Sequence, residues 1–157
     1  MIEPNKVYYI NKGNFASQAN VLAKICTTLN SVKEPIDPHI FLDYVSKGLA
    51  FGRCIILVTF NEAQELNACM VTFLNHVPIK GKVLWIEWAW TDGKDLKIGK
   101  TVMEAVEELA RQIGANRVAG AMTRGFKAVF RKYGLKEAYR VVEKIIEKEV
   151  NENVEKD

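Results

Sequence analysis

The residues best suited to chemistry lie between positions 85 and 101, where an apolar segment ends in a polar loop and a helical pattern begins. Glu87 is the only acid within the apolar segment 82–90. Burial between Trp85 and Trp88 would raise the pKa of its carboxyl group toward a value that suits a general base. The same burial also suits a structural carboxylate that pairs with an Arg or Lys on a neighbouring strand. Both interpretations of Glu87 stay open.

The loop after this segment has the composition of an anion-binding site. Three lysines surround the expected start of a helix, at Lys94, Lys97 and Lys100. At the start of a helix the first backbone N–H groups lack partners within the helix, and the helix dipole places a partial positive charge at that end. Gly99 lets a ligand approach the backbone, and Thr101 adds a hydroxyl donor. An ordinary helix start capped by Asp95, with solvated lysines, explains the same residues and is favoured on this pattern alone.

Other residue types that often do chemistry are sparse. Cys26, Cys54 and Cys69 lie in apolar stretches without a C-x-x-C spacing, which predicts buried free thiols in a reducing compartment. His39 and His76 lie in unrelated settings, so no metal site is expected. His76 is a second candidate base, although a surface-loop histidine is the favoured interpretation.

The elements that must position these residues follow from hydrophobic periodicity and turn residues. Strands are predicted at 7–10, 53–61, 66–74, 82–90 and 117–122. Helices are predicted at 15–29, 38–47, 98–113 and 125–133. Asp37 caps the second helix and Gly48 ends it, whereas Gly114 ends the third. Segments 53–61 and 66–74 form an antiparallel hairpin, 82–90 is a central strand buried on both faces, and 136–150 fits a strand better than a helix.

Length and composition bound the class of protein. The 157 residues carry a formal net charge of +3, and 48% of them are hydrophobic. This composition is typical of a soluble globule, excludes a largely disordered chain, and is too mildly basic to indicate a nucleic-acid partner. No apolar run approaches the ~18 residues that cross a bilayer, and the first residues have no apolar signal core. We therefore expect a cytoplasmic protein that does not associate with membranes, with one domain over 1–150 and a frayed acidic tail over 151–157.

The order of the elements resembles the GNAT acetyltransferase superfamily. In that family a strand leads into a loop, a long helix, another strand and a short helix, which together bind acyl-CoA. The matching segments are Ile98–Arg111, Gly114–Val118 and Thr123–Leu135. The resemblance covers about residues 82–135, and the order of the earlier elements agrees. It implies an α/β fold (an α+β mixed sheet) with a central, mostly antiparallel sheet flanked by helices.

The resemblance also implies which residues bind acetyl-CoA. Backbone groups of the central strand would face the pantetheine arm and the acetyl group, at Trp88, Ala89 and Trp90. The pyrophosphate would lie on the helix start, at Leu96, Lys97, Ile98, Gly99, Lys100 and Thr101. In the family's loop motif, Lys94 replaces the usual Gln or Arg, Lys97 replaces the first glycine, and only Gly99 matches. Thr123 stands where an Asn often bonds the cofactor, and Phe130 stands where many members have a tyrosine that protonates the leaving thiolate.

The leading hypothesis is thus an N-acyltransferase that transfers the acetyl group of acetyl-CoA to a primary amine of a small molecule or protein. The base would be Glu87 or a relayed water molecule. Residues 30–50, including Phe41 and Tyr44, would build the acceptor side. The final strand would pair two subunits in a homodimer.

Two other hypotheses remain. A catalytically inactive GNAT-like domain that binds CoA, or that acts through protein contacts, is favoured by Phe130 and by the altered loop. A nucleic-acid- or protein-binding module would instead use the basic segment Arg124–Lys132 against phosphates.

Overall fold

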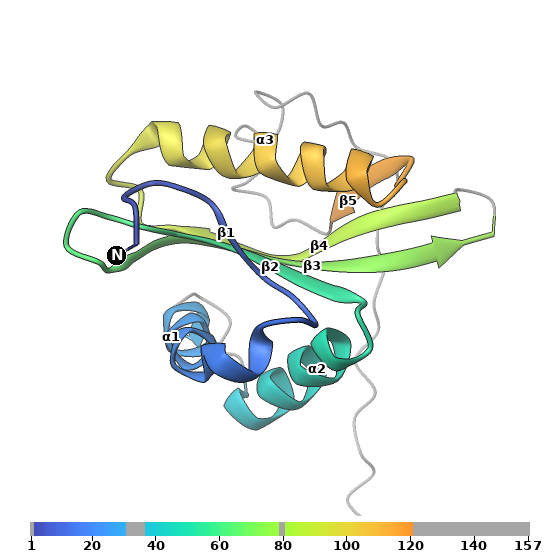
Figure 1. Ribbon diagram of the computed structural model, residues 1–157, viewed down its shortest axis with the longest axis horizontal. Coiled ribbons are helices and arrows are strands. Elements are labelled where there is room, and N and C mark those ends of the chain that lie inside the picture. The colour runs from blue at the N-terminus through green and yellow to red at the C-terminus, as the bar shows by residue number, and fades with distance from the viewer. Residues whose placement is uncertain (1, 31–36, 79–80, 121–157) are drawn as a thin grey trace, which may run out of the picture.

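A mixed sheet, with five strands in the described part of the chain, is flanked by helices on both faces (Figure 1). The computed structural model describes residues 2–30, 37–78 and 81–120. The strands are β1 (Tyr8–Ile10), β2 (Cys54–Phe60), β3 (Leu66–Val77), β4 (Gly81–Thr91) and β5 (Arg117–Gly120). They lie in the order β1-β2-β3-β4-β5, and every neighbouring pair is antiparallel except β4 and β5, which are parallel. The predicted fold class is confirmed.

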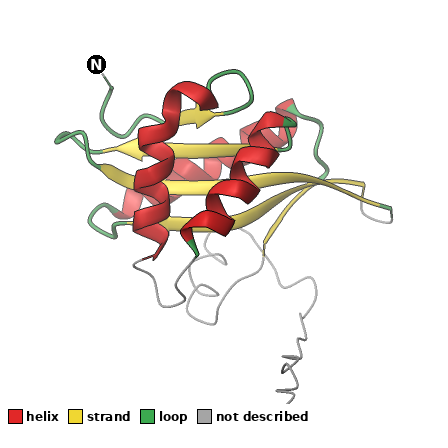
Figure 2. Cartoon of the chain, turned by 90° about the horizontal axis from the view of Figure 1, so that it is seen from below, coloured by secondary structure: helices red, strands yellow, loops and turns green. Residues whose placement is uncertain are grey.

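The helices form the two outer layers. A short 3₁₀ helix, η1 (Phe15–Gln18), leads into α1 (Ala19–Asn30), and α2 (Pro38–Ala50) follows it. Figure 1 shows α1 and α2 under one face of the sheet and α3 (Leu96–Gln112) over the other. Figure 2 looks onto the sheet from the side of α1 and α2. The elements predicted at 125–133 and 136–150 lie outside the described residues, as do Thr123 and Phe130.

Two hydrophobic cores fill the space between these layers. On the α1/α2 face, side chains of β2 such as Ile56 and Val58 pack against both helices. On the other face, Leu57 packs against α3. This alternation along β2 follows from the two-residue period of a strand. Most residues of β2 and β3 are buried, whereas β4 is buried only at Val83, Leu84 and Ile86, so the prediction that β4 is a central strand buried on both faces was wrong.

Helix α2 shows one confirmed and one wrong prediction. The Asp37 side chain caps it by accepting hydrogen bonds from the backbone N–H groups of His39 and Ile40. Gly48 does not end the helix, which continues to Ala50. A Cβ atom at Gly48 would lie 2.5 Å from a ring carbon of Phe73 and 2.8 Å from the Cβ of Cys54. Gly48 is therefore a packing glycine that lets α2 approach the sheet closely.

The thiol prediction is confirmed for burial and pairing. Cys26, Cys54 and Cys69 are all buried and form no disulfide. Burial raises the pKa of the Cys54 and Cys69 thiols to about 12 each, which leaves them protonated and unreactive at neutral pH. Among the described residues, no helix has the length and apolar character to cross a membrane, and no group of side chains is arranged to hold a metal ion.

Candidate functional site

The edge of β4 is open along its second half. Its pairing with β5 runs from Val83 to Ile86, opposite Arg117 to Gly120. From Glu87 to Thr91, no described strand pairs with β4 on that side, while β3 continues to pair with it on the other. Among residues 2–30, 37–78 and 81–120, the backbone N–H and C=O groups on this side have no strand partner, which is the arrangement that an extended ligand can pair with.

A β-bulge lies where the two strands part. Thr72 of β3 pairs with Ile86 and the preceding residue, Val71, pairs with Trp88, so Glu87 is an extra residue of β4. Ile86 packs in the α3 core, whereas Trp88 packs against the α1/α2 core. The bulge has thus shifted the alternation of β4 by one residue. Bulges bend a strand and increase its twist, which is the local change that opens the edge.

Gly120 makes the last contact before β4 and β5 separate. A Cβ atom at this position would lie 2.9 Å from the backbone oxygen of Ile86 and 3.3 Å from the Cβ of Ile86. Any other residue would push the two backbones apart at their final pair. The closeness of the strands at Ile86 and their separation after it therefore depend on a glycine here.

The environment of Glu87 differs from both sequence interpretations. Its side chain is exposed, so the burial on which the prediction of a raised pKa rested is absent. Glu87 forms no ion pair with a described residue, so the structural-carboxylate interpretation has no partner in the described part of the chain. Ala89 packs in the α3 core after the shift in alternation, so Glu87 and Ala89 lie on opposite faces of the sheet although they are two residues apart.

The negative charge of Glu87 acts instead on Tyr44 of α2. Burial, and after it the charge of Glu87, raises the pKa of the Tyr44 hydroxyl, while the nearby Arg53 acts in the opposite direction. Glu87 therefore faces the α2 side of the open edge. A carboxylate in that position is accessible to solvent and to a ligand that approaches from α2.

An aromatic wall adjoins Glu87 on this side, formed by Phe41, Tyr44, Phe73 and Trp88. The Tyr44 ring lies 4.7 Å from that of Phe73 and 6.1 Å from that of Trp88, measured between centroids. Phe41 supports Trp88 from beneath, with the centroids 5.0 Å apart and Phe41 itself 1% exposed. Tyr44 is 46% exposed, so its ring presents a face to an incoming molecule. The predicted acceptor residues Phe41 and Tyr44 are thus brought together with β4.

The loop from β4 to α3 is built by two short carboxylate contacts. The Asp92 side chain accepts from the backbone N–H of Lys94 at 3.0 Å, across Gly93 with its positive φ of 72°. The Asp95 side chain then accepts from the backbone N–H of Lys97 at 2.9 Å and caps α3. The capped helix start that the sequence pattern favoured is therefore present. One of the N–H groups that the resemblance assigned to a pyrophosphate is already occupied.

The side chains at the start of α3 divide into free and occupied groups. Lys94 and Lys97 are exposed and form no ion pair with a described residue. Lys100 lies 3.8 Å from Glu104. The Thr101 hydroxyl donates to the backbone oxygen of Lys97 at 3.1 Å, so the predicted free hydroxyl donor is occupied.

The residues Leu96, Ile98 and Gly99 in the same turn differ in their exposure to solvent. Leu96 is 88% exposed, whereas Ile98 is 2% exposed and packs in the α3 core. Gly99 is half-buried. The Ile98 side chain is therefore withdrawn into the core, and its backbone N–H donates to the backbone oxygen of Asp95 at 3.2 Å. Leu96 adds an exposed apolar group next to the lysines.

Asn67 holds this loop to the sheet through a buried hydrogen-bond chain that the sequence analysis missed. Its side chain accepts from the Thr59 hydroxyl at 2.5 Å and donates to the side chain of Asn5 at 2.9 Å. Its backbone oxygen accepts from the N–H of Asp92 at 2.9 Å. Asn67 is 3% exposed. The available signal was an amide residue at the start of a predicted buried strand, where such a group needs partners.

Both histidines are exposed, but His76 lies within β3 and not in the surface loop that was the favoured interpretation. His39 is exposed in the first turn of α2, next to the capping Asp37. His76 is exposed near the hairpin end of β3, where it pairs with Lys82. This end of β3 is distant in register from Glu87. Neither histidine adjoins the open edge of β4.

Comparison with known proteins rests on structure. No protein-family model matches the sequence, and no curated protein sequence matches it either. An aminoglycoside N-acetyltransferase in complex with CoA superposes with a TM-score of 0.70 at 13% identity, over 90% of this chain and 93% of that one. A predicted acetyltransferase with acetyl-CoA from Clostridium acetobutylicum gives a TM-score of 0.68 at 12% identity, over 89% and 95% of the two chains. A putative acetyl transferase from Pyrococcus furiosus gives 0.64 at 19% identity, over 90% and 100%.

This chain has the GNAT acetyltransferase fold. The similarity spans nearly the full length of each of these proteins, and the identities are low enough that the shared property is the fold. In this GNAT fold, the residues predicted for cofactor and catalysis fall into two groups. Trp88, Ala89 and Trp90 line the open edge of β4, and the residues from Lys94 to Thr101 lie at its far end. Glu87 and the aromatic wall lie on the α2 side of the same edge.

Proposed function

We propose that this chain is an N-acyltransferase that transfers the acetyl group of acetyl-CoA to a primary amine. The observation that carries the proposal is the open edge of β4, which begins at the Glu87 bulge and leads to the basic start of α3. An extended arm would pair with the backbone of Trp88, Ala89 and Trp90 as an added strand pairs with a free sheet edge. The helix start and its free lysines favour a diphosphate at the end of that arm.

The chain's own groups supply what the chemistry requires. Acetyl-CoA, when bound, supplies a thioester whose carbonyl carbon the amine attacks, with the CoA thiolate as leaving group. The amine must lose a proton to attack, and the exposed Glu87 carboxylate accepts that proton directly or through one water. Backbone N–H groups of the open edge stabilise the negative charge that develops on the carbonyl oxygen.

The aromatic wall supports an amine as the acceptor. The exposed ring of Tyr44 attracts a cation through its π face, and the Glu87 carboxylate adds a negative charge beside it. Trp88, backed by the buried Phe41, makes the rest of this surface apolar. A primary amine on an apolar stem matches both properties.

A second function, a catalytically inactive CoA-binding or protein-interaction domain, is favoured by the start of α3. Asp95 occupies the N–H of Lys97 and places a carboxylate where a diphosphate would lie, and the Thr101 hydroxyl is also occupied. These contacts would weaken binding of an anion. They leave the open edge of β4 unaffected.

Calorimetric titration with acetyl-CoA, using CoA and ATP for comparison, tests the proposal. We expect one-to-one micromolar binding that Gly99→Glu weakens strongly and that Gly13→Glu, in the exposed loop after β1, leaves unchanged.

Turnover is then measured on a panel of amines. Glu87→Gln should lower the rate about a hundredfold without changing acetyl-CoA affinity, and a variant with full activity would exclude Glu87 as the base. No binding at millimolar acetyl-CoA would contradict the proposed acyltransferase activity and favour the second function, a protein-interaction domain.

A further inference from the structure

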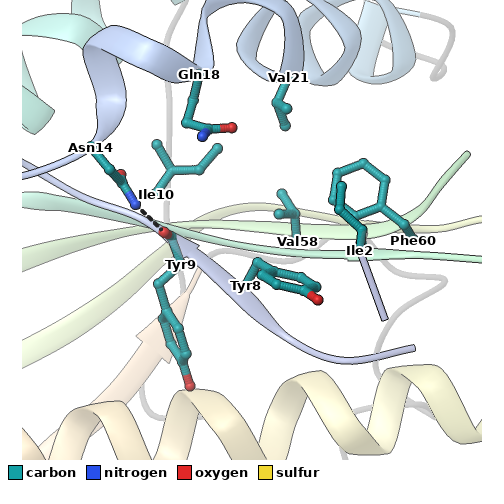
Figure 3. A pocket seen from close by; sticks show the side chains of 9 residues that line it. All are labelled: Ile2, Tyr8, Tyr9, Ile10, Asn14, Gln18, Val21, Val58 and Phe60. Atoms are coloured by element: carbon teal, nitrogen blue, oxygen red, sulfur yellow. Dashed lines mark hydrogen bonds between the residues drawn. The ribbon is translucent and has the colours of Figure 1, made fainter. Parts of the chain in front are cut away.

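A cavity lies at the other edge of the sheet, away from the opening between β4 and β5. It has a volume of about 170 Å³, is partly open to solvent, and is lined by residues of β1, β2, η1 and the first turn of α1, together with Ile2 and Asn14. Figure 3 shows side chains from the helical segment and from the sheet directed into the same space. The cavity shares no lining residue with the open edge of β4 or with the start of α3.

The walls of the cavity are almost entirely apolar. The main contributors are Ile2, Tyr8, Ile10, Val21, Val58 and Phe60. The rings of Tyr8 and Phe60 meet edge to face, with centroids 6.4 Å apart. Tyr9 also borders the cavity, but its side chain points toward α3 (Figure 3). Such walls favour an apolar occupant, because an empty space leaves their atoms without dispersion contacts on one side.

Two amide side chains reach the cavity, and they differ in what they have left to bind. Both ends of the Asn14 amide are engaged, since its NH₂ group donates to the backbone oxygen of Tyr9 at 2.8 Å and its oxygen accepts from the N–H of Asn11 at 2.9 Å. Gln18 is half-buried, and its amide makes no hydrogen bond with any described residue. In Figure 3 the Gln18 amide points toward Ile10 and the interior of the cavity. The Gln18 amide is thus available to a ligand.

The volume sets the size of that ligand. An apolar protein cavity of about 150 Å³ stays dry and binds benzene. The present cavity is slightly larger and carries one free amide. It therefore matches a single six-membered ring with one small polar substituent.

We propose that this cavity binds a neutral, single-ring aromatic compound that carries one hydrogen-bonding group, at a site separate from the proposed acetyl-transfer site. The ring contacts Tyr8, Phe60 and the aliphatic side chains, and its polar group bonds to the amide of Gln18. The site does not depend on whether the chain binds acetyl-CoA.

Phenol, benzene and cyclohexylamine are the probes that test the proposed site. Their binding to the full-length wild-type protein is measured by NMR. We expect phenol to bind with a dissociation constant of about 1 mM or lower, about fivefold more tightly than benzene because of one added hydrogen bond. The cationic cyclohexylamine should not bind. Intermolecular NOEs from the phenol ring should reach the methyl groups of Val21 and Val58, which locates the ligand without any variant.

Three variants make the test specific. Gln18→Leu should remove the preference for phenol over benzene. Val21→Phe should fill part of the cavity and weaken both ligands at least tenfold, while Ala23→Phe, an exposed site on the same helix, should change neither. The absence of phenol binding at 10 mM, or NOEs to residues outside the cavity, would overturn the proposal. Equal affinity for phenol and benzene in the wild type would overturn the assigned ligand class.

Discussion

Asp95→Asn tests whether an anionic ligand lies at the start of α3. The Asp95 carboxylate accepts from the N–H of Lys97 at 2.9 Å and is the N-cap of the helix. Asparagine caps helices about as well as aspartate, so the hydrogen bond is expected to survive. The substitution removes only the favourable contact of the charge with the helix dipole, which costs about 0.3–1 kcal/mol of unfolding free energy.

The effect on ligand binding has the opposite sign. A unit charge about 6 Å from one phosphate charge contributes about 0.7 kcal/mol of repulsion in water. Two phosphate charges give about 1.4 kcal/mol, which corresponds to a tenfold change in dissociation constant. We therefore expect Asp95→Asn to bind acetyl-CoA about three to ten times more tightly at ~10 mM salt, where the Debye length is about 30 Å. Most of this gain should disappear at ~1 M salt, where screening acts over about 3 Å.

The assay is calorimetric titration at both salt concentrations, with thermal unfolding measured on the same samples. Glu108→Gln is the matched control, since it makes the same change in net charge about 20 Å along the same helix. It should leave affinity within a factor of two. An affinity for acetyl-CoA that is unchanged or weaker in Asp95→Asn at low salt would refute the placement of the pyrophosphate at α3. Tighter binding at both salt concentrations would refute the electrostatic reasoning.

Three further predictions concern stability. Gly48→Ala should lower the unfolding free energy by about 1–3 kcal/mol in urea denaturation, because its Cβ would overlap Phe73 and Cys54; a stabilised variant would show that α2 can move away from the sheet. Burial raises the folded-state pKa of Cys54 and Cys69 to about 12, so their contribution to the unfolding free energy is fully present below pH ~8.5. As the pH rises toward 12, the unfolding free energy falls by about 1.4 kcal/mol per pH unit for each thiol, because the unfolded chain loses these protons first. Replacing both cysteines with alanine should flatten this pH dependence between pH 9 and 10.5, and a variant with the same slope as the wild type would contradict the prediction. Asn67→Ala should cost about 1–3 kcal/mol by leaving a buried hydroxyl unpaired, and should increase hydrogen exchange in the β4–α3 loop; unchanged exchange there would contradict its role in holding the loop.

Local sequence patterns were sufficient for most elements of the fold. The apolar stripe of α3, the Asp37 and Asp95 caps, and the hairpin of β2 and β3 are all present as predicted. Each depends on residues within a few positions of one another. The register of the sheet could not be read in the same way, because it depends on pairing between β3 and β4, whose partners are as many as 23 positions apart in the sequence (Ala68 with Thr91).

The geometry of the candidate site followed only in part from the sequence. The predicted strand, loop and helix over 85–101 are present, and the aromatic residues of α2 adjoin that strand. The exposure of Glu87 was missed, because a single inserted residue in β4 reverses which side chains face which core. The role of Asn67 was missed because its partners, Asn5 and Asp92, come from two other parts of the chain.

The sequence by itself determined the helices of the described residues, the buried thiols, and a capped helix start after an apolar strand, because these follow from short-range periodicity, capping and hydrophobicity. Only the tertiary structure decided that β4 separates from β5 after Ile86, that Gly120 permits their last contact, and that Glu87 faces the aromatic wall in solvent. These features arise where two strands and a helix meet. Their geometry is set by backbone packing between distant segments, which no local pattern of residues encodes.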